Sequence, residues 1–277
     1  MITNGKEIAL IGYEKLKEEI KLLDKKPGLA VILVGDNPAS IRYVSQKAKW
    51  AKEVGIQFKL IKRERGIQEE ELKEDIKKLN NDETIHGIII QLPLPSHIDT
   101  NTIINTIYPV KDIDGFTAIN MGKIALGDES GLAPCTPSGV IHICKVNSID
   151  LEGKNVTIIG RSNIVGKPLV SMCINEGATV TCCNSKTKDL KSHTQNADIV
   201  VLATGKPGIL TKDMIKKEAF VIDVGFTVID EKIYGDACFQ EISENGNPIT
   251  PVPGGVGRLT VLFIMKNTLK AFYMQNK

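Results

Sequence analysis

The sequence predicts an α/β protein of two domains, each built around a parallel sheet. Short apolar runs alternate with helical stretches along the chain, which is typical of β-α-β units. The runs fall into two blocks. Between them, residues 109–136 have several glycines and little periodicity, so we expect loop and linker there. The 277 residues suffice for one large or two medium domains.

In the first block, the apolar runs at 29–34, 58–61 and 87–92 are expected to be buried strands. Helices are expected between them at 40–54 and 69–79. In the first of these helices, apolar residues recur at helical spacing and would face the core: Ile41, Val44, Ala48, Ala51 and Val54.

A predicted helix at 137–146 leads into the second block, with strands at 155–159, 179–183, 198–203 and 220–224 and a helix at 166–175. This order favours a nucleotide-binding domain between about 140 and 250. A long apolar-rich helix, 259–273, follows the glycine turn at 254–257 and is expected to return to the first domain.

Composition excludes several classes of function. A net charge of +2 with interleaved lysines and acids, and only 5% aromatic residues, argues against nucleic-acid binding. No apolar run approaches the roughly 20 residues that span a bilayer, and the polar start lacks a signal-peptide core, so cytoplasmic residence is expected. The six cysteines form no C-x-x-C pair and the four histidines are scattered, which predicts no metal site.

The turn from Gly160 to Gly166 follows a predicted strand and opens a helix. Free backbone N–H groups at such a helix start can hold a pyrophosphate. The turn has the first and last glycine of G-x-G-x-x-G but lacks the middle one, so an ordinary strand-to-helix turn stays open as an alternative.

The end of the next strand distinguishes the two nicotinamide cofactors. NAD-binding units usually place an acid there to bond the ribose 2′-hydroxyl. This strand ends without one, and Ser185 and Lys186 stand where the 2′-phosphate of NADP would lie. Arg161 on the first turn would supply a second cation in a geometry that suits phosphate. The sequence therefore predicts NADP.

Polar residues in the first block form a weaker pattern. Tyr43 and Lys47 share a helix face that is separate from the apolar one, and from spacing alone a solvated basic surface is the favoured interpretation. Gln91 ends an apolar strand, where ligands bind in parallel sheets. Asp112 and Asp114 lie in a loop, where acids usually form turns or caps.

Together these segments resemble the bifunctional methylenetetrahydrofolate dehydrogenase/cyclohydrolase family over nearly the whole chain. The resemblance rests on eight segments in order: Pro38-Ala39-Ser40, Tyr43-Val44-x-x-Lys47-x-Lys49, Gly55-Ile56, Gln91-Leu92-Pro93-Leu94-Pro95, Lys111-Asp112-Ile113-Asp114-Gly115-Phe116, Pro134-Cys135-Thr136-Pro137, Gly160-Arg161-Ser162-x-Ile164-Val165-Gly166-x-Pro168 and Thr250-Pro251-Val252-Pro253-Gly254-Gly255-Val256-Gly257.

The resemblance implies a catalytic domain, 1–139 completed by 251–277, and a Rossmann-like NADP-binding domain, 140–250. It implies a homodimer, tetrahydrofolate derivatives as substrates and no metal. The implied catalytic residues are Lys47, Tyr43, Gln91 and Asp114. The implied substrate-binding residues are Tyr43, Gln91, Leu92, Asp114, Pro253, Gly254 and Gly255, and the cofactor-binding residues are Thr136, Gly160, Arg161, Ser162, Ile164, Val165, Ser185, Lys186 and Thr260.

The chain departs from the family pattern at Arg258, where proline is common, at Asn184, where histidine is frequent, and over residues 235–239. Three other functions stay open. They are a shikimate-type NADP dehydrogenase, a catalytically silent scaffold, and an enzyme with only one of the two activities.

Overall fold

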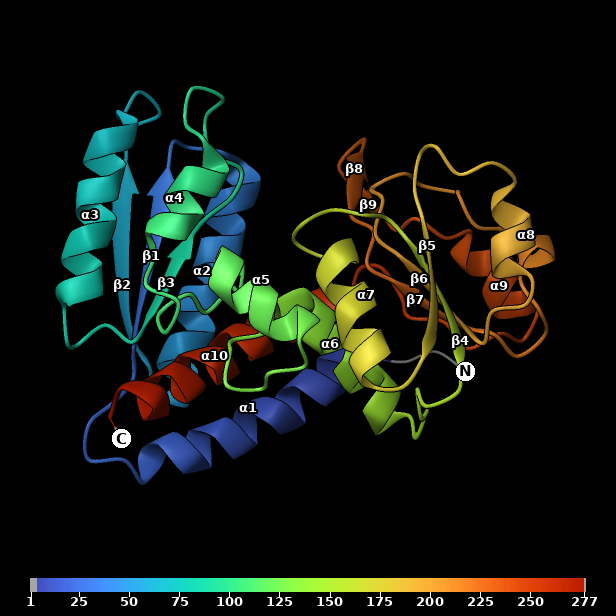
Figure 1. Cartoon of the computed structure of the whole chain (residues 1–277), viewed down its shortest axis with the longest axis horizontal. Coiled ribbons are helices and arrows are strands. Elements are labelled where there is room, and N and C mark those ends of the chain that lie inside the picture. Colours follow the sequence, from blue (N-terminus) through green and yellow to red (C-terminus); the bar gives the residue numbers. More distant parts are fainter. Residues whose placement is uncertain (1–3, 277) are drawn as a thin grey trace. The chain divides into compact units, whose positions relative to one another are not determined.

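The computed structural model describes residues 4–276 and divides into two compact units. Of the described residues, the N-terminal unit comprises 10–135 and 261–276. The central unit comprises 136–260 and 4–9. Each unit has its own parallel sheet (Figure 1), which confirms the predicted α/β fold class.

The N-terminal unit contains three parallel strands in the order β2-β1-β3. Their bounds are Gly28–Val34 for β1, Gln57–Arg63 for β2 and Gly87–Ile90 for β3. The helices that contribute to this unit are α1 (Gly5–Lys21), α2 (Pro38–Val54), α3 (Glu69–Asn81), α4 (Thr100–Thr106), α5 (Ala118–Ala125) and α10 (Val256–Gln275).

One face of this sheet forms a core with α3 and α4. Alternate residues of a strand point to the same face, and the core contains the even-numbered residues of β1 and β3 together with apolar residues of α3 and α4. The central β1 is buried along its full length, as expected for a strand with neighbours on both sides and both faces covered. The three apolar runs of the first block therefore form strands, as predicted.

Helix α2 buries one stripe of residues at spacings of three and four: Ser40, Val44, Lys47, Ala51 and Val54. The prediction that Ile41 faces the core is wrong, since it is 43% exposed. Ile41 lies about 100° around the helix from Ser40, outside the stripe. The same geometry puts Lys47 on the face of Val44 and Ala51, whereas a separate polar face was expected.

The prediction of loop and linker over 109–136 is wrong in part. Residues 118–125 form helix α5, and Thr117 caps its N-terminus by accepting a hydrogen bond from Asn120 N. Asn120 is buried and donates from Nδ2 to Pro109 O and to Asp112. The helix is too short to show a clear apolar period, and its polar core contacts stabilise it instead.

The central unit contains four parallel strands in the order β5-β4-β6-β7. They span Asn155–Ile159 (β4), Thr179–Cys183 (β5), Ile199–Leu202 (β6) and Phe220–Asp223 (β7). A short antiparallel pair, β8 (Thr227–Ile229) and β9 (Lys232–Tyr234), follows. The helices are α6 (Cys135–Val146), α7 (Gly166–Asn175), α8 (Leu190–Thr194) and α9 (Phe239–Glu244), with a 3₁₀ turn at Lys212–Met214.

Helix α10 confirms the predicted long C-terminal helix and extends it by a few residues at each end. Polar residues such as Asn267 and Thr268 lie in its buried face. Among residues 4–276, no helix combines the length and apolar character that a bilayer crossing requires.

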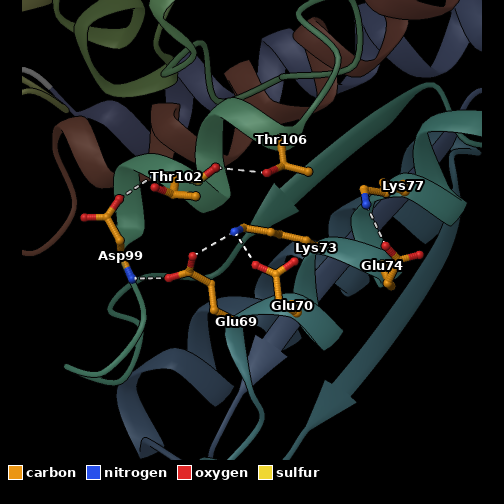
Figure 2. A network of polar contacts seen from close by, with 8 residues as sticks. All are labelled: Glu69, Glu70, Lys73, Glu74, Lys77, Asp99, Thr102 and Thr106. Carbon is orange, nitrogen blue, oxygen red and sulfur yellow. Dashed lines mark hydrogen bonds and ion pairs between the residues drawn. The ribbon is translucent and has the colours of Figure 1, made fainter.

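An exposed polar network joins α3 to the start of α4 (Figure 2). Lys73 pairs with Glu69 at 2.9 Å and with Glu70 at 2.7 Å. Glu69 also accepts a hydrogen bond from Asp99 N, and Asp99 caps α4 by accepting from Thr102 N. Such solvated pairs contribute little to stability, and we assign them no part in the site.

Candidate active site

Lys47 is a buried cation on α2. Asn37 caps this helix by accepting hydrogen bonds from Ala39 N and Ser40 N, and Gly55 ends it in a left-handed conformation. The Lys47 side chain is 7% exposed, and its Nζ donates to Gln91 Oε1 at 2.9 Å. A buried ammonium group without a hydrogen bond would be costly, so the hydrogen bond to Gln91 stabilises the Lys47 ammonium in this buried position.

Gln91 directly follows β3. Its backbone N–H donates to Ile32 O at 2.9 Å and so continues the parallel ladder for one more residue. Its side-chain Nε2 donates to Leu92 O at 2.8 Å. With the nitrogen engaged by a carbonyl, the amide oxygen is left to face Lys47. Gln91 therefore lies at the carboxyl end of a parallel strand, as expected from the sequence.

The loop that holds Asp114 is fixed by its neighbour Asp112, which is 1% exposed. Asp112 accepts hydrogen bonds from Thr117 N at 2.7 Å and from Asn120 Nδ2 at 2.9 Å. It therefore holds the backbone of this loop in place. Asp114 is only partly buried, and its charge is close enough to raise the pKa of Lys47.

Burial moves the pKa values of these two groups toward each other. Desolvation lowers the pKa of Lys47, and the nearby Asp114 partly offsets that effect. Desolvation also raises the pKa of Asp114 to about 6, although the positive charge of Lys47 opposes the shift. In both cases the loss of water outweighs the pair's attraction. A lowered pKa of the amine and a raised pKa of the carboxyl group both favour proton exchange, as general acid–base catalysis requires.

Two further residues in this region were not singled out from the sequence. Cys135 is 2% exposed and interacts electrostatically with both Lys47 and Asp114. Its Sγ donates to Ile113 O, and burial raises the pKa of its thiol. Asn267 on α10 donates from Nδ2 to Ile113 O and to Ala133 O, both at 2.8 Å. A lone asparagine on an apolar helix face was the available signal.

Tyr43 lies one turn before Lys47 on α2 and is partly buried, which raises its pKa. Leu92 packs against the apolar core beside β3, and its carbonyl is the group that orients Gln91. The N-terminal unit therefore brings together all the predicted residues of the first block: Tyr43, Lys47, Gln91, Leu92 and Asp114.

In the central unit, the turn after β4 is shaped to expose backbone donors. Gly160 has a φ of +132°, and a Cβ there would collide with Ala203 O. Within residues 4–276, no acceptor bonds the N–H groups of residues 161–164, all of which are exposed. Ser162 Oγ accepts from Val165 N at 3.2 Å and so orders the turn. Free N–H groups before a helix suit a phosphate.

Arg161 and the end of β5 lie at the same edge of this sheet. The positive charge of Arg161 partly offsets the burial that raises the pKa of Cys182, so the two residues are close. Beyond β5, Asn184 organises a turn by accepting from Lys186 N at 3.0 Å, which leaves the side chains of Ser185 and Lys186 exposed. These groups fit a phosphorylated ribose, and no acid at the strand end competes with it.

The remaining predicted residues also lie in the central unit. Thr136 and Thr260 share a hydrogen bond of 2.9 Å between their hydroxyl groups. Pro253 is exposed and Gly254 has a φ of +115°, a conformation that glycine adopts readily. Gly255 is buried against Gly5. The described residues hold no group of three or more histidine, cysteine, aspartate or glutamate side chains that could bind a metal.

Comparison with known proteins identifies the family. Residues 3–114 match the domain described as "Tetrahydrofolate dehydrogenase/cyclohydrolase, catalytic domain", and residues 134–276 match its "NAD(P)-binding domain". The bifunctional protein FolD of Bacillus licheniformis is 47% identical over 274 residues, which cover 98% of this chain and 96% of that protein.

Solved structures agree. The bifunctional methylenetetrahydrofolate dehydrogenase/cyclohydrolase of Campylobacter jejuni superposes with a TM-score of 0.97 at 45% identity, covering 99% of each chain. The Trypanosoma brucei enzyme, complexed with NADP cofactor and inhibitor, gives 0.95 at 34% identity over 100% of this chain and 98% of that one. Shikimate dehydrogenase of Aquifex aeolicus, at 16% identity and 0.53, shares only the fold. The chain belongs to the tetrahydrofolate dehydrogenase/cyclohydrolase family.

Proposed function

We propose that this chain oxidises 5,10-methylenetetrahydrofolate with NADP to the 5,10-methenyl form, and then hydrolyses that product to 10-formyltetrahydrofolate in one-carbon metabolism. The observation that carries the proposal is the buried Lys47, which donates a hydrogen bond to Gln91 and interacts electrostatically with Asp114. Family membership over both domains supports the pairing of the two reactions.

The dehydrogenase step transfers a hydride from the methylene bridge of the substrate, and NADP⁺, when bound, accepts it. The task of the protein is to align the two reactants. We assign the nucleotide to the turn at Gly160, Arg161, Ser162, Ile164 and Val165, with Ser185 and Lys186 beside its 2′-phosphate. Thr136 and Thr260 are proposed as further contacts on the cofactor side. The free N–H groups of the turn support this assignment.

The cyclohydrolase step adds water to the bridge carbon of the methenyl cation, after which the ring opens and a proton leaves. We propose Lys47 as the group that exchanges protons in this step, because burial lowers its pKa and so eases loss of the proton that general acid–base catalysis requires. Gln91 holds its ammonium, and Tyr43 lies beside it to contact the substrate.

Asp114 is proposed to accept hydrogen bonds from the amino and N–H edge of the pterin, a donor pair that suits a carboxylate. Its ionised form is needed for this, and its pKa of about 6 allows ionisation at neutral pH. The backbones of Leu92, Pro253, Gly254 and Gly255 are proposed as further contacts with the substrate, with glycine permitting close approach.

We propose residues 1–139 with 251–277 as the catalytic domain and 140–250 as the NADP-binding domain. We also propose that the protein is a homodimer and works in the cytoplasm. The family resemblance supports the dimer.

The test is a spectrophotometric assay of purified protein with methylenetetrahydrofolate, run separately with NADP and with NAD. We expect reduction of NADP together with a transient absorbance of the methenyl product that decays as it is hydrolysed. A methenyl band that forms and does not decay would leave dehydrogenase activity alone. The absence of cofactor reduction with either nucleotide would contradict the proposal.

A further inference from the structure

Asp236 is a buried carboxylate that the proposed chemistry does not use. It follows β9 and is 0% exposed. Its Oδ2 accepts three hydrogen bonds from one turn: from Thr204 N at 2.6 Å, from Thr204 Oγ1 at 2.8 Å and from Gly205 N at 3.1 Å. A single oxygen atom thus fixes both the backbone and the side chain of that turn.

A second buried carboxylate holds Asp236 in place. Asp223 ends β7 and is 2% exposed. It accepts hydrogen bonds from Asp236 N at 3.0 Å, Ala237 N at 2.9 Å and Gly225 N at 2.8 Å. The side chain of Asp223 therefore fixes the backbone of Asp236, and the side chain of Asp236 fixes the turn at Thr204.

The turn at Thr204 lies where a dinucleotide would bind. In the order β5-β4-β6-β7, strand β5 lies on one side of β4 and strand β6 lies on the other side. The direction in which strands are added therefore reverses between β4 and β6, which is the topological switch point of the sheet. Ligands of such sheets bind at the carboxyl ends of the strands at this point. Gly160 directly follows β4, and a Cβ on it would collide with Ala203, which directly precedes Thr204.

Asp236 also carries a cost that packing alone does not justify. Its Oδ1 has no hydrogen-bond partner within residues 4–276. A Cβ on Gly225 would collide with this oxygen, so only glycine fits there. Two carboxylates buried side by side repel each other, and an unpaired buried oxygen is unfavourable. Such features persist where function selects for them.

We propose that Asp236 is a positioning residue of the nucleotide site: it holds the Thr204–Gly205 turn against the Gly160 turn, and Asp223 anchors it. This inference rests on the proposed function, because it assumes that the Gly160 turn binds NADP. It adds two acidic residues to the site, neither of which is expected to contact the cofactor.

The experiment compares dissociation constants for NADP and for a folate substrate analogue in three variants of the full chain. In Asp236→Leu, which removes the acceptor, NADP should bind at least 10-fold more weakly while folate affinity stays within about 2-fold. Asp236→Asn keeps an oxygen at the turn and should rescue NADP binding to within about 3-fold. Thr204→Val, which removes one of the three bonds, should weaken NADP binding by several-fold.

Thr194→Val is the matched control for a general loss of structure in the central unit. Thr194 is 0% exposed, and its hydroxyl donates to Met214 O at 2.6 Å, away from the turn. It should leave NADP affinity unchanged. A merely structural role for Asp236 predicts that Asp236→Leu and Thr194→Val have the same effect on NADP binding, and that result would overturn the inference.

Two readouts separate this inference from the proposed function. Hydrolysis of added methenyltetrahydrofolate requires no cofactor, so Asp236→Leu should keep wild-type cyclohydrolase rates. If the wild-type protein neither binds NADP nor hydrolyses this substrate, the proposed function fails and the inference with it. If the wild type does both and the Asp236→Leu and Thr204→Val variants bind NADP normally, the inference alone fails. Should Asp236→Leu not fold, Thr204→Val still decides.

Discussion

Lys47 and Asp114 are opposite charges held in a place where neither is well solvated. Attraction between them stabilises both charged forms, yet desolvation is the larger effect on each pKa. The protein gives up stability for this, since a buried amine and a half-buried acid fold less favourably than apolar residues would. The gain is an amine whose pKa is lowered and a carboxyl group whose pKa is raised to about 6.

Asp114→Asn should make unfolding less dependent on pH. The pKa of Asp114 is about 6 in the folded protein, whereas the ordinary value for an aspartate, which we take for the unfolded chain, is 3.8. The folded state therefore binds more protons between these values, and wild-type stability falls as pH rises through this window. Relative to wild type, the variant should gain about 1–2 kcal/mol between pH 4 and pH 7, measured by urea unfolding. Parallel pH profiles for both proteins would refute the assigned shift.

The burial of Lys47 shows what a single side chain adds beyond the sequence pattern. Tyr43 and Lys47 were expected to share a helix face away from the apolar one, and from spacing alone a solvated basic surface was the favoured interpretation. Positions 40, 44, 47, 51 and 54 form the buried stripe, so the spacing contained the signal. From sequence alone, a lysine at such a position is expected to be exposed unless its buried hydrogen-bond partner is known. Gln91, the partner, is 44 positions away in the sequence.

Among the elements, strands were predicted more securely than the segments between them. Strands β4 and β5 begin and end as predicted because each is a short apolar run bounded by glycine or polar residues. Helix α5 was missed because buried polar contacts of Asn120 support it. No element was expected over residues 5–21, although they form α1, whose charged residues obscure its buried side.

Helix α10 contributes to the N-terminal unit a long-range hydrogen-bonding residue that a local sequence pattern cannot predict. Asn267 bonds the carbonyls of Ile113 and Ala133, more than 130 positions earlier. Since Ile113 directly precedes Asp114, this helix positions the carboxylate. The role of Asn267 depends on the chain returning to the N-terminal unit, which only the three-dimensional fold reveals.

Asn267→Leu should therefore impair both stability and substrate binding. It leaves the Ala133 carbonyl without the Asn267 donor and leaves the Ile113 carbonyl with only the weak Cys135 thiol as a donor, which should lower the free energy of unfolding by about 1–3 kcal/mol. The KM for methylenetetrahydrofolate should rise, while the KM for NADP stays near the wild-type value. Asn101→Leu, at an exposed position on α4, is the control and should change neither quantity. Equal increases in both KM values would argue for general disorder instead.

The two units of the chain have separate sheets and separate cores, and each contains residues to which we assign a role in the proposed function. The amine and carboxylate lie in the N-terminal unit, and the phosphate-binding turn lies in the central unit. Family motifs in both units made the function predictable from sequence. Which side chains hold those motifs in place, namely Asp112, Asn267 and Asp236, followed only from the structure.

The assembly state is a prediction at the scale of the whole molecule. Two chains of 30.3 kDa should sediment together as a homodimer at micromolar concentration. Sedimentation equilibrium measures the mass directly and without reference to activity. A single species with the mass of one chain at all concentrations would contradict the dimer. It would leave the proposed chemistry untouched, because every residue assigned to it lies within one chain.

The most direct test of the proposed chemistry is the cyclohydrolase rate of Lys47→Met, followed as the decay of methenyltetrahydrofolate absorbance. Methionine keeps the length and packing of the side chain but cannot exchange a proton. We predict a loss of at least about 100-fold, with folate binding retained and with Lys52→Met, an exposed neighbour on the same helix, fully active. Wild-type turnover by a folded Lys47→Met protein would contradict the role of this amine.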